Sequence, residues 1–232
     1  MDCVDPVRDE GFAIVEDVLD DTSISRFVKL LEDVARVEQN RGGVRNLLDI
    51  PEMRELAYSA QVLSLVKPVL GEGAFAVRGI LFDKRDGANW KVPWHQDVTI
   101  AVKQRVEAEG YVAWSVKQDV LHVQPPSNVL EKMLSVRLHL DDCQVTNGAL
   151  RVIPKSHLGG KLSQESITKL VREDTVITCA VESGDVLLIR PLVIHASSAA
   201  KTPQHRRVIH FDYANVGLAE GLEWREDTAL NS

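Results

Sequence analysis

The sequence predicts a mainly β protein of the α+β class, with helices in its N-terminal part and strands in the remainder. Up to about residue 72, apolar residues recur at helical spacing. From about residue 73 they form short runs bounded by turn-forming residues, as strands do. A chain of 232 residues with 44% hydrophobic content can bury one large core. We therefore expect a single domain over residues 1–232, with a helical part at about 1–72 and a β core at about 73–215.

Two helices are expected in the N-terminal part. The first follows capping residues at 20–22, and its apolar face carries Phe27, Leu30, Leu31, Val34 and Val37. The second begins near Pro51 and ends at Gly71. Between them, the glycine-rich segment 41–48 interrupts the helical pattern. Its Arg45 and Asn46 could reach over a pocket, although a loop in solvent fits this composition equally well.

Strands are expected at residues 75–82, 98–103, 133–143, 186–189, 192–195 and 207–213. Segment 133–143 alternates apolar and polar residues, which places one face in the core. On the other face, we expect Arg137 and His139 to face solvent or to support the site from behind. The polar, proline-containing stretch 118–128 is predicted to be a long loop and a candidate substrate lid.

The segment His95-Gln96-Asp97 carries the chemistry, together with His195 and Arg206 downstream. In an extended segment residues i and i+2 point to the same side, so the side chains of His95 and Asp97 can both face one metal ion. His195 lies at the end of a predicted strand. Two imidazoles and one carboxylate are the set that holds non-heme iron(II) on one face and leaves the other face open. A guanidinium such as that of Arg206 can bind the far carboxylate of a chelating dicarboxylate.

Three ordered motifs resemble those of the phytanoyl-CoA dioxygenase family of iron(II)- and 2-oxoglutarate-dependent oxygenases. They are Trp94-His95-Gln96-Asp97, the turn from Thr146 to His157, and the block from Gly184 to Arg206. The resemblance extends from about residue 75 to residue 213. It implies a double-stranded β-helix core of the cupin-like jelly-roll type, with the N-terminal helices packed outside.

By this resemblance, His95, Asp97 and His195 match the metal ligands and catalytic centre. Arg206 matches the 2-oxoglutarate-binding arginine, and Ser197 a residue that hydrogen-bonds the same co-substrate. As candidate substrate contacts we take Trp94 and Gln96 beside the ligands, and Arg45 and Asn46 from the glycine-rich connection.

The expected cofactors are iron(II), 2-oxoglutarate and O₂, and the expected reaction hydroxylates a C–H bond with release of succinate and CO₂. In related halogenases a small residue replaces the carboxylate ligand, so Asp97 disfavours halogenation. Two alternatives remain open. One is a cupin-like metalloenzyme that does not use 2-oxoglutarate, and the other is a non-catalytic relative that binds a metal or ligand. Arg206 argues against both.

Composition limits the partners. The chain has 27 Lys and Arg against 34 Asp and Glu, a net charge of −7, which disfavours nucleic acid and anionic membranes. We expect a small-molecule substrate and no obligate protein partner. Lys84, Arg85, Lys91 and Lys103 could serve an anionic substrate, although residues of this kind are more often solvated. An acidic N-terminus and three scattered cysteines predict a cytoplasmic protein without disulfides.

Overall fold

The computed structural model describes residues 3–37, 43–201 and 205–226, so Arg41 and Gly42 of the glycine-rich connection lie outside it. The helices are α1 (Val4–Asp9), α2 (Asp21–Val37), α3 (Pro51–Ala57), α4 (Ala60–Leu70), α5 (Ser127–Leu130) and α6 (Gln164–Glu173). The strands are β1 (Phe12–Val15), β2 (Val44–Arg45), β3 (Phe75–Lys84), β4 (Val92–His95), β5 (Ile100–Val102), β6 (Val112–Lys117), β7 (Val120–Gln124), β8 (Met133–His139), β9 (Leu150–Val152), β10 (Ile177–Cys179), β11 (Val186–Ile189), β12 (His195–Ser197) and β13 (Arg206–Ala214). Short 3₁₀ turns lie at Leu47–Asp49, Val145–Asn147 and Ser156–Gly159.

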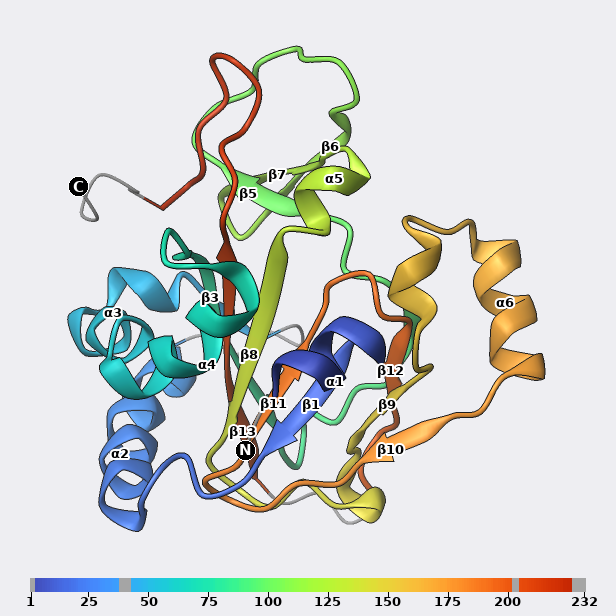
Figure 1. Ribbon diagram of the computed structural model, residues 1–232. Helices are drawn as coiled ribbons and strands as arrows, with labels where there is room; N and C mark the ends of the chain where they lie inside the picture. The colour runs from blue at the N-terminus through green and yellow to red at the C-terminus, as the bar shows by residue number, and fades with distance from the viewer. Residues whose placement is uncertain (1–2, 38–42, 202–204, 227–232) are drawn as a thin grey trace.

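A six-stranded sheet forms the larger layer of the fold, with strand order β1-β11-β8-β13-β3-β2. Its central strands β3, β8 and β13 run side by side through the middle of the molecule (Figure 1). All neighbouring strands in this sheet are antiparallel. Val208 on β13 lies opposite both Phe82 on β3 and His139 on β8, which fixes the register of the three strands.

The N-terminal helices cover the outer face of this sheet, as the sequence predicts. Helices α2, α3 and α4 lie together on one side of it (Figure 1). Apolar residues of these helices form one core cluster with Leu134, Val136 and Leu138 of β8. The predicted alternation of β8 is therefore confirmed. The intervening side chains of β8 face the opposite side, and they too are buried.

A four-stranded sheet, ordered β10-β9-β12-β4, packs against the inner face of the larger sheet. A core cluster joins Leu187 and Ile189 of β11 to Leu150 and Val152 of β9. Two packed antiparallel sheets of this kind form the expected double-stranded β-helix, or jelly roll. Helix α6 packs on the outside of the smaller sheet through Ile167.

Several parts of the chain differ from the sequence prediction. The helix expected between Pro51 and Gly71 is divided into α3 and α4, and the strand expected at 192–195 is replaced by β12, which begins at His195. Strand β1 lies within the segment predicted to be helical, because Phe12–Val15 completes the sheet edge beside β11. The predicted lid at 118–128 is instead the second half of a hairpin followed by helix α5. Gln118 and Asp119 both have positive φ, 48° and 59°, and form a two-residue turn between β6 and β7. The prediction of a long loop was wrong because this turn lacks the usual Asn-Gly signal.

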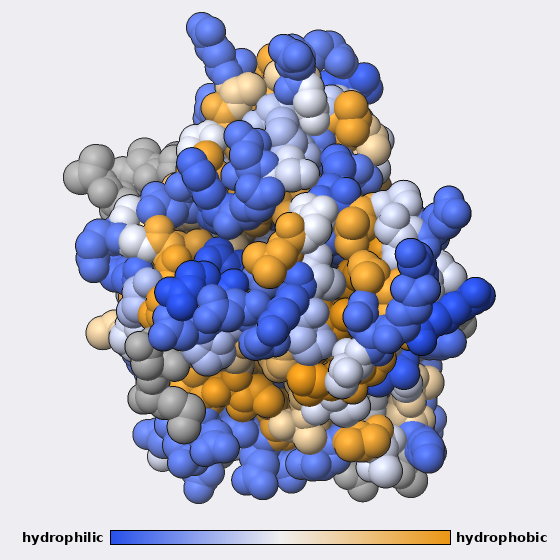
Figure 2. All heavy atoms as spheres, turned by 45° about the vertical axis from the view of Figure 1, so that its right-hand side comes forward, coloured by the Kyte–Doolittle hydropathy of each residue, from blue (hydrophilic) through white to orange (hydrophobic). Residues whose placement is uncertain are grey.

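Hydrophilic side chains cover most of the face shown in Figure 2, with apolar side chains exposed in patches between them. Val116 on β6 and Leu158 in the third 3₁₀ turn are among the most exposed apolar residues, at 66% and 69%. Along the described part of the chain, no helix has the length and apolar character needed to cross a bilayer. Cys3, Cys143 and Cys179 are buried, and no disulfide joins them.

Candidate active site

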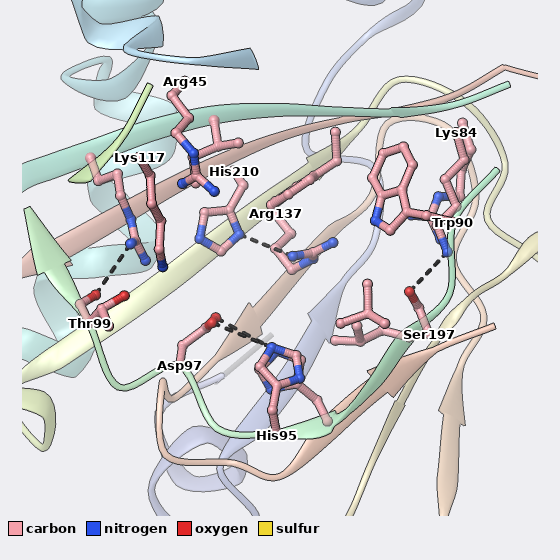
Figure 3. Close-up of a pocket in the computed structure, with 17 residues that line it drawn as sticks. Arg45, Lys84, Trp90, His95, Asp97, Thr99, Lys117, Arg137, Ser197 and His210 are labelled. Carbon is pink, nitrogen blue, oxygen red and sulfur yellow. Dashed lines mark hydrogen bonds and ion pairs between the residues drawn. The ribbon is translucent and has the colours of Figure 1, made fainter. Parts of the chain in front are cut away.

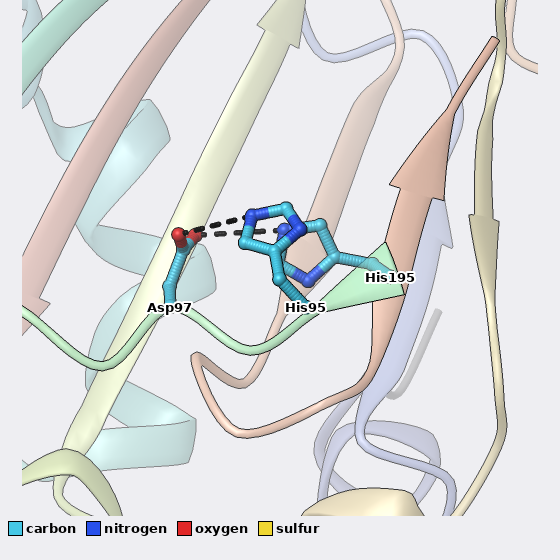
Figure 4. Close-up of side chains that lie close together, drawn as sticks. All are labelled: His95, Asp97 and His195. Carbon is cyan, nitrogen blue, oxygen red and sulfur yellow. Dashed lines mark ion pairs between the residues drawn. The ribbon is translucent and has the colours of Figure 1, made fainter. Parts of the chain in front are cut away.

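Two histidines and one aspartate come together where the smaller sheet faces the larger one. His95 ends β4 and His195 begins β12, and the two residues are direct partners in the antiparallel pairing of these strands. Asp97 follows β4 by two positions, and its backbone N–H donates to Pro191 O at 2.9 Å. The Nε2 atoms of both histidines lie 3.6 Å from carboxylate oxygens of Asp97 (Figure 4). One ligand atom from each residue lies within 4.8 Å of the others, so the three can hold one metal ion.

Backbone contacts orient both imidazoles for this purpose. Nδ1 of His95 lies 2.9 Å from Pro93 O, and Nδ1 of His195 lies 2.9 Å from Val193 O. A carbonyl oxygen can only accept, so Nδ1 carries the proton and Nε2 keeps the lone pair that a metal needs. Burial lowers the pKa of His195 to about 4, which keeps its imidazole neutral at neutral pH. Burial opposes ionisation of Asp97, but the neighbouring His95, His195 and Arg78 side chains hold its pKa well below the usual value.

The triad opens into a cavity of about 230 Å³ between the two sheets. The side chains around it come from both layers (Figure 3). They are Arg45, Arg78, Ile80, Phe82, Lys84, Trp90, Val92, His95, Asp97, Thr99, Lys117, Arg137, Leu150, His195, Ser197, Arg206 and His210. Six of these side chains are cationic and one is a carboxylate, so the cavity is strongly basic although the chain as a whole is acidic.

Arg206 and Ser197 lie together on the wall of the cavity, as the sequence predicts. Arg206 donates through Nη1 to Gly148 O, and its buried Nε has no hydrogen-bond partner among the described residues. Gly148 has a φ of +86°, and a Cβ there would lie 2.5 Å from Ser198 O. The Thr146–His157 turn therefore needs glycine at this point to bring its carbonyl to Arg206.

Lys84 is the third polar group at this end of the cavity. Its Nζ donates to Ser197 Oγ at 2.9 Å and to Ser198 O at 2.6 Å. Burial, reinforced by the charge of Arg206, lowers the pKa of Lys84 to about 7. The negative charge of a bound carboxylate would offset both the burial of Lys84 and its repulsion from Arg206, so this end of the cavity suits an anion.

A chain of polar side chains runs along the inner face of the larger sheet. Arg137 Nη1 lies 3.1 Å from His210 Nδ1, and His210 Nε2 lies 2.9 Å from Asp212 Oδ1. Asp212 also accepts from Arg78 Nε at 2.5 Å and from Ser135 Oγ at 2.5 Å. Burial opposes the charge of Asp212, but Arg78 and His210 lower its pKa far enough to keep it ionised.

Arg137 corrects the sequence prediction, which placed it and His139 toward solvent or behind the site; His139 does not line the cavity. Both are buried, at 9% and 2% exposure, and Arg137 lines the cavity directly. Alternation alone distinguishes the two faces of β8, but it does not show that the smaller sheet covers the second face. Arg137 tolerates burial because it lies 5.3 Å from the Phe82 ring and contacts His210.

The four candidate substrate contacts are placed differently from one another. Arg45 lines the cavity, whereas Asn46 takes a left-handed conformation before a 3₁₀ turn and faces a separate small pocket. Trp94 packs outside the cavity, with the Arg151 guanidinium 5.0 Å from its ring centre. Gln96 is buried and fully hydrogen-bonded to backbone groups of Gly160, Leu192 and Leu162. Its position between two ligands turns it away from the metal, so Trp94, Gln96 and Asn46 are not retained as substrate contacts.

Sequence reasoning missed several residues that line the cavity. Arg78 could have been found from the alternation of β3, where Arg78, Ile80 and Lys84 share one face. Lys84 was considered only as one of four flanking cations, and the other three do not line the cavity. Lys117 carried no signal, because its hairpin was taken for a loop.

A jelly roll that presents two histidines and one carboxylate to a buried cavity defines a class of metal-binding β protein. The family model described as phytanoyl-CoA dioxygenase (PhyH) matches residues 7–208, and the chain belongs to this family. The peroxisomal phytanoyl-CoA dioxygenase of Mus musculus is 23% identical to it over 247 aligned positions, which cover 88% of the chain. The match spans 65% of the mouse protein, a little under two thirds of its length.

Solved structures share the fold at low sequence identity. SnoN, an epimerase of nogalamycin biosynthesis crystallised with Fe³⁺ and α-ketoglutarate (2-oxoglutarate), has a TM-score of 0.69 and 16% identity, covering 99% of this chain and 87% of its own. HygX from Streptomyces hygroscopicus, crystallised with nickel and 2-oxoglutarate, has a TM-score of 0.64 and 18% identity, covering 90% and 83%. The carbocyclase SnoK, also of nogalamycin biosynthesis, has a TM-score of 0.68 and 16% identity, covering 92% and 83%.

Proposed function

We propose that this chain is an iron(II)- and 2-oxoglutarate-dependent oxygenase that hydroxylates a C–H bond of a small molecule and releases succinate and CO₂. The observation that carries the proposal is the placement of His95, Asp97 and His195 on one cavity with Arg206. Iron and 2-oxoglutarate, the cofactors expected from the sequence, are also those named for SnoN. Family membership supports the oxygenase class, and the particular reaction is our inference.

The ligand set fits iron(II). Both imidazoles present an unprotonated Nε2 toward an ionised carboxylate, and three protein ligands on one side leave positions open for a chelating co-substrate and O₂. When bound, iron(II) with 2-oxoglutarate supplies the oxidising chemistry. The chain holds these groups in position at the cavity between the sheets.

Arg206 and Ser197 are proposed to bind the far carboxylate of 2-oxoglutarate. The unpartnered Nε of Arg206 is a donor available to an anion, and a buried donor without a partner is costly until one arrives. Ser197 presents Oγ to Lys84, so its own proton is free to point at a carboxylate oxygen. Lys84 adds a third positive or hydrogen-bonding group at the same point.

Hydroxylation is the outcome that the ligands favour over halogenation, because Asp97 occupies the position that a halide would need. Jelly rolls of this fold nevertheless include an epimerase and a carbocyclase. Substrate placement near the metal decides between such outcomes, and it depends on cavity residues rather than on the triad.

The test is an anaerobic titration of the purified protein with iron(II) and then 2-oxoglutarate. Bidentate chelation of iron(II) by the co-substrate gives a visible metal-to-ligand charge-transfer band. The proposal expects this band in the wild-type protein, and its appearance only at higher 2-oxoglutarate concentration in Arg206→Ala. A folded, iron-loaded protein that gives no band would not be an oxygenase of this kind. Succinate release in air with candidate substrates then identifies the reaction.

A further inference from the structure

The cavity has a second basic end, on the other side of the triad from Arg206. Figure 3 shows Arg45, Lys117 and Thr99 at one end and Lys84, Trp90 and Ser197 at the other, with the side chains of Asp97 and His95 between them. The co-substrate proposed above occupies the Lys84 end. The Arg45 end is therefore the part of the cavity open to substrate.

Two cations at this end have no partner. Neither the Arg45 guanidinium nor the Lys117 ammonium makes a hydrogen bond or ion pair with a described residue, whereas the nearby Arg78 is paired with Asp212. The only carboxylate among the described cavity residues is Asp97, which is committed to the metal ligands. Arg45 and Lys117 thus bring positive charge to the cavity, and among the described cavity residues only the negative charge of Asp97 offsets it.

Arg45 is half-buried, whereas Lys117 is exposed at the mouth of its hairpin and still lines the cavity. Partial burial lowers the pKa of both side chains, and the positive charge of Arg78 lowers each further, while the negative charge of Asp97 raises both. Lys117 also experiences the charge of Arg45 directly. Iron(II) and the doubly negative 2-oxoglutarate cancel each other, so binding of the cofactors leaves this excess unchanged.

The fold holds the two cations in place rather than leaving them on free loops. Arg45 is on β2, where it pairs with Ile80 of β3, and Lys117 is the last residue of β6. Gln118, next to Lys117, donates through Nε2 to Gly43 O at 3.3 Å, which ties the β6–β7 hairpin to the start of β2. A binding group supported in this way loses little entropy when its ligand arrives.

We propose that the substrate carries an anionic group, a carboxylate or a phosphate, which Arg45 and Lys117 bind on the substrate side of the metal. This inference rests on the proposed function, because it divides the cavity into a co-substrate end and a substrate end. Binding the anion here would fix one end of the substrate and present a C–H bond at a set distance from the metal. A neutral substrate would leave both cations unpaired and partly desolvated.

The first test uses the holoenzyme, loaded without oxygen with iron(II) and saturating 2-oxoglutarate so that added acids cannot occupy the co-substrate end. The probes share one aromatic scaffold: phenylacetate, benzyl phosphate and phenylacetamide. Binding is followed through the change in the charge-transfer band as a probe enters beside the metal. We expect an anionic probe to bind at least about tenfold more tightly than the amide, as one charge-assisted hydrogen bond provides.

Variants test whether Arg45 and Lys117 cause the tighter binding of the anionic probes. Arg45→Gln and Lys117→Gln should each reduce the preference for the anion by about tenfold, whereas Lys29→Gln, an exposed lysine on α2, should leave it unchanged. The carboxylate and phosphate arms show which anion is preferred, and either preference supports the proposal. Equal binding of the amide and both anions, with the band present, overturns the anionic substrate while the oxygenase proposal stands. Absence of the band overturns both.

A second measurement needs no ligand. Removing the half-buried one of two like charges should raise the midpoint of thermal unfolding of the substrate-free protein by about 1–3 °C in Arg45→Gln. The Lys29→Gln control should stay within about 1 °C of the wild type. A fall in the midpoint of Arg45→Gln would show that Arg45 already has a stabilising partner, and this too would overturn the proposal.

Discussion

Gln96 offers the sharpest test of how the metal ligands are held in place. Its side chain is 6% exposed and makes three hydrogen bonds to the backbone. Nε2 donates to Gly160 O at 2.8 Å and Leu192 O at 2.7 Å, and Oε1 accepts from Leu162 N at 2.8 Å. These contacts tie the segment between His95 and Asp97 to Leu192, which precedes β12, and to residues 160 and 162, which precede α6.

Replacing Gln96 by Ala removes all three partners at once. At about 1 kcal/mol for each buried hydrogen bond, the free energy of unfolding should fall by about 3 kcal/mol. For a chain of this size that corresponds to a loss of about 6–12 °C in the unfolding midpoint. The freed segment should also bind iron(II) more weakly, because two of the three ligands lose their fixed separation.

Calorimetry and urea unfolding of the metal-free protein measure the unfolding midpoint and the free energy of unfolding directly. Gln104→Ala is the matched control, since Gln104 makes a single exposed contact of 3.4 Å with Gly221 O and its loss should cost under about 0.5 kcal/mol. If Gln96→Ala unfolds within about 2 °C of the wild type and affects only substrate binding, Gln96 is a substrate contact after all. The positioning argument would then be refuted.

Three further predictions concern the ligands, the anchor and buried charge. His95→Ala or Asp97→Ala should abolish iron binding and 2-oxoglutarate turnover, and retention of either activity, read from iron stoichiometry and succinate release, would mean that the triad is misplaced. Arg206→Ala should raise the 2-oxoglutarate concentration needed for half-maximal band intensity about 10- to 100-fold while iron stays bound; an unchanged value would assign the anchor elsewhere. Burial lowers the pKa of His139 to about 3. As the pH falls from about 6.5 toward 3, the unfolded chain therefore takes up a proton that the folded protein refuses, and stability falls by at most about 1.4 kcal/mol per pH unit. His139→Leu should flatten this slope in urea unfolding, and an equal slope in both proteins would contradict a buried neutral imidazole.

The sequence allowed the metal triad to be predicted because its geometry is local. His95 and Asp97 are two residues apart on an extended segment, and His195, which begins β12 instead of ending the predicted strand 192–195, lies where β12 meets β4. The jelly roll and the outer helices followed from the family resemblance and from the helical spacing of the N-terminal part. Periodicity and the three ordered motifs were therefore enough to predict the fold class, although not every element of it.

The remaining features depend on contacts between distant segments, which periodicity does not report. Strand β1 is only four residues long, and its identity as a strand depends on β11, more than 170 residues away. The burial of Arg137 depends on the smaller sheet covering β8. Lys117 reaches the cavity only because an unpredicted turn at Gln118 and Asp119 closes its hairpin.

The excess of positive charge in the cavity is the feature that composition conceals most completely. The chain carries a net charge of −7, yet six of the side chains around the cavity are cationic. The pKa of Arg137 is lowered to about 10, mainly by burial and then by the charge of Arg206. The ion pair of Arg78 with Asp212 neutralises one charge, and among the described residues the other five cations have no carboxylate partner within ion-pair distance. Cationic side chains that gather at both ends of one cavity are best explained by two anionic ligands that bind on either side of the metal.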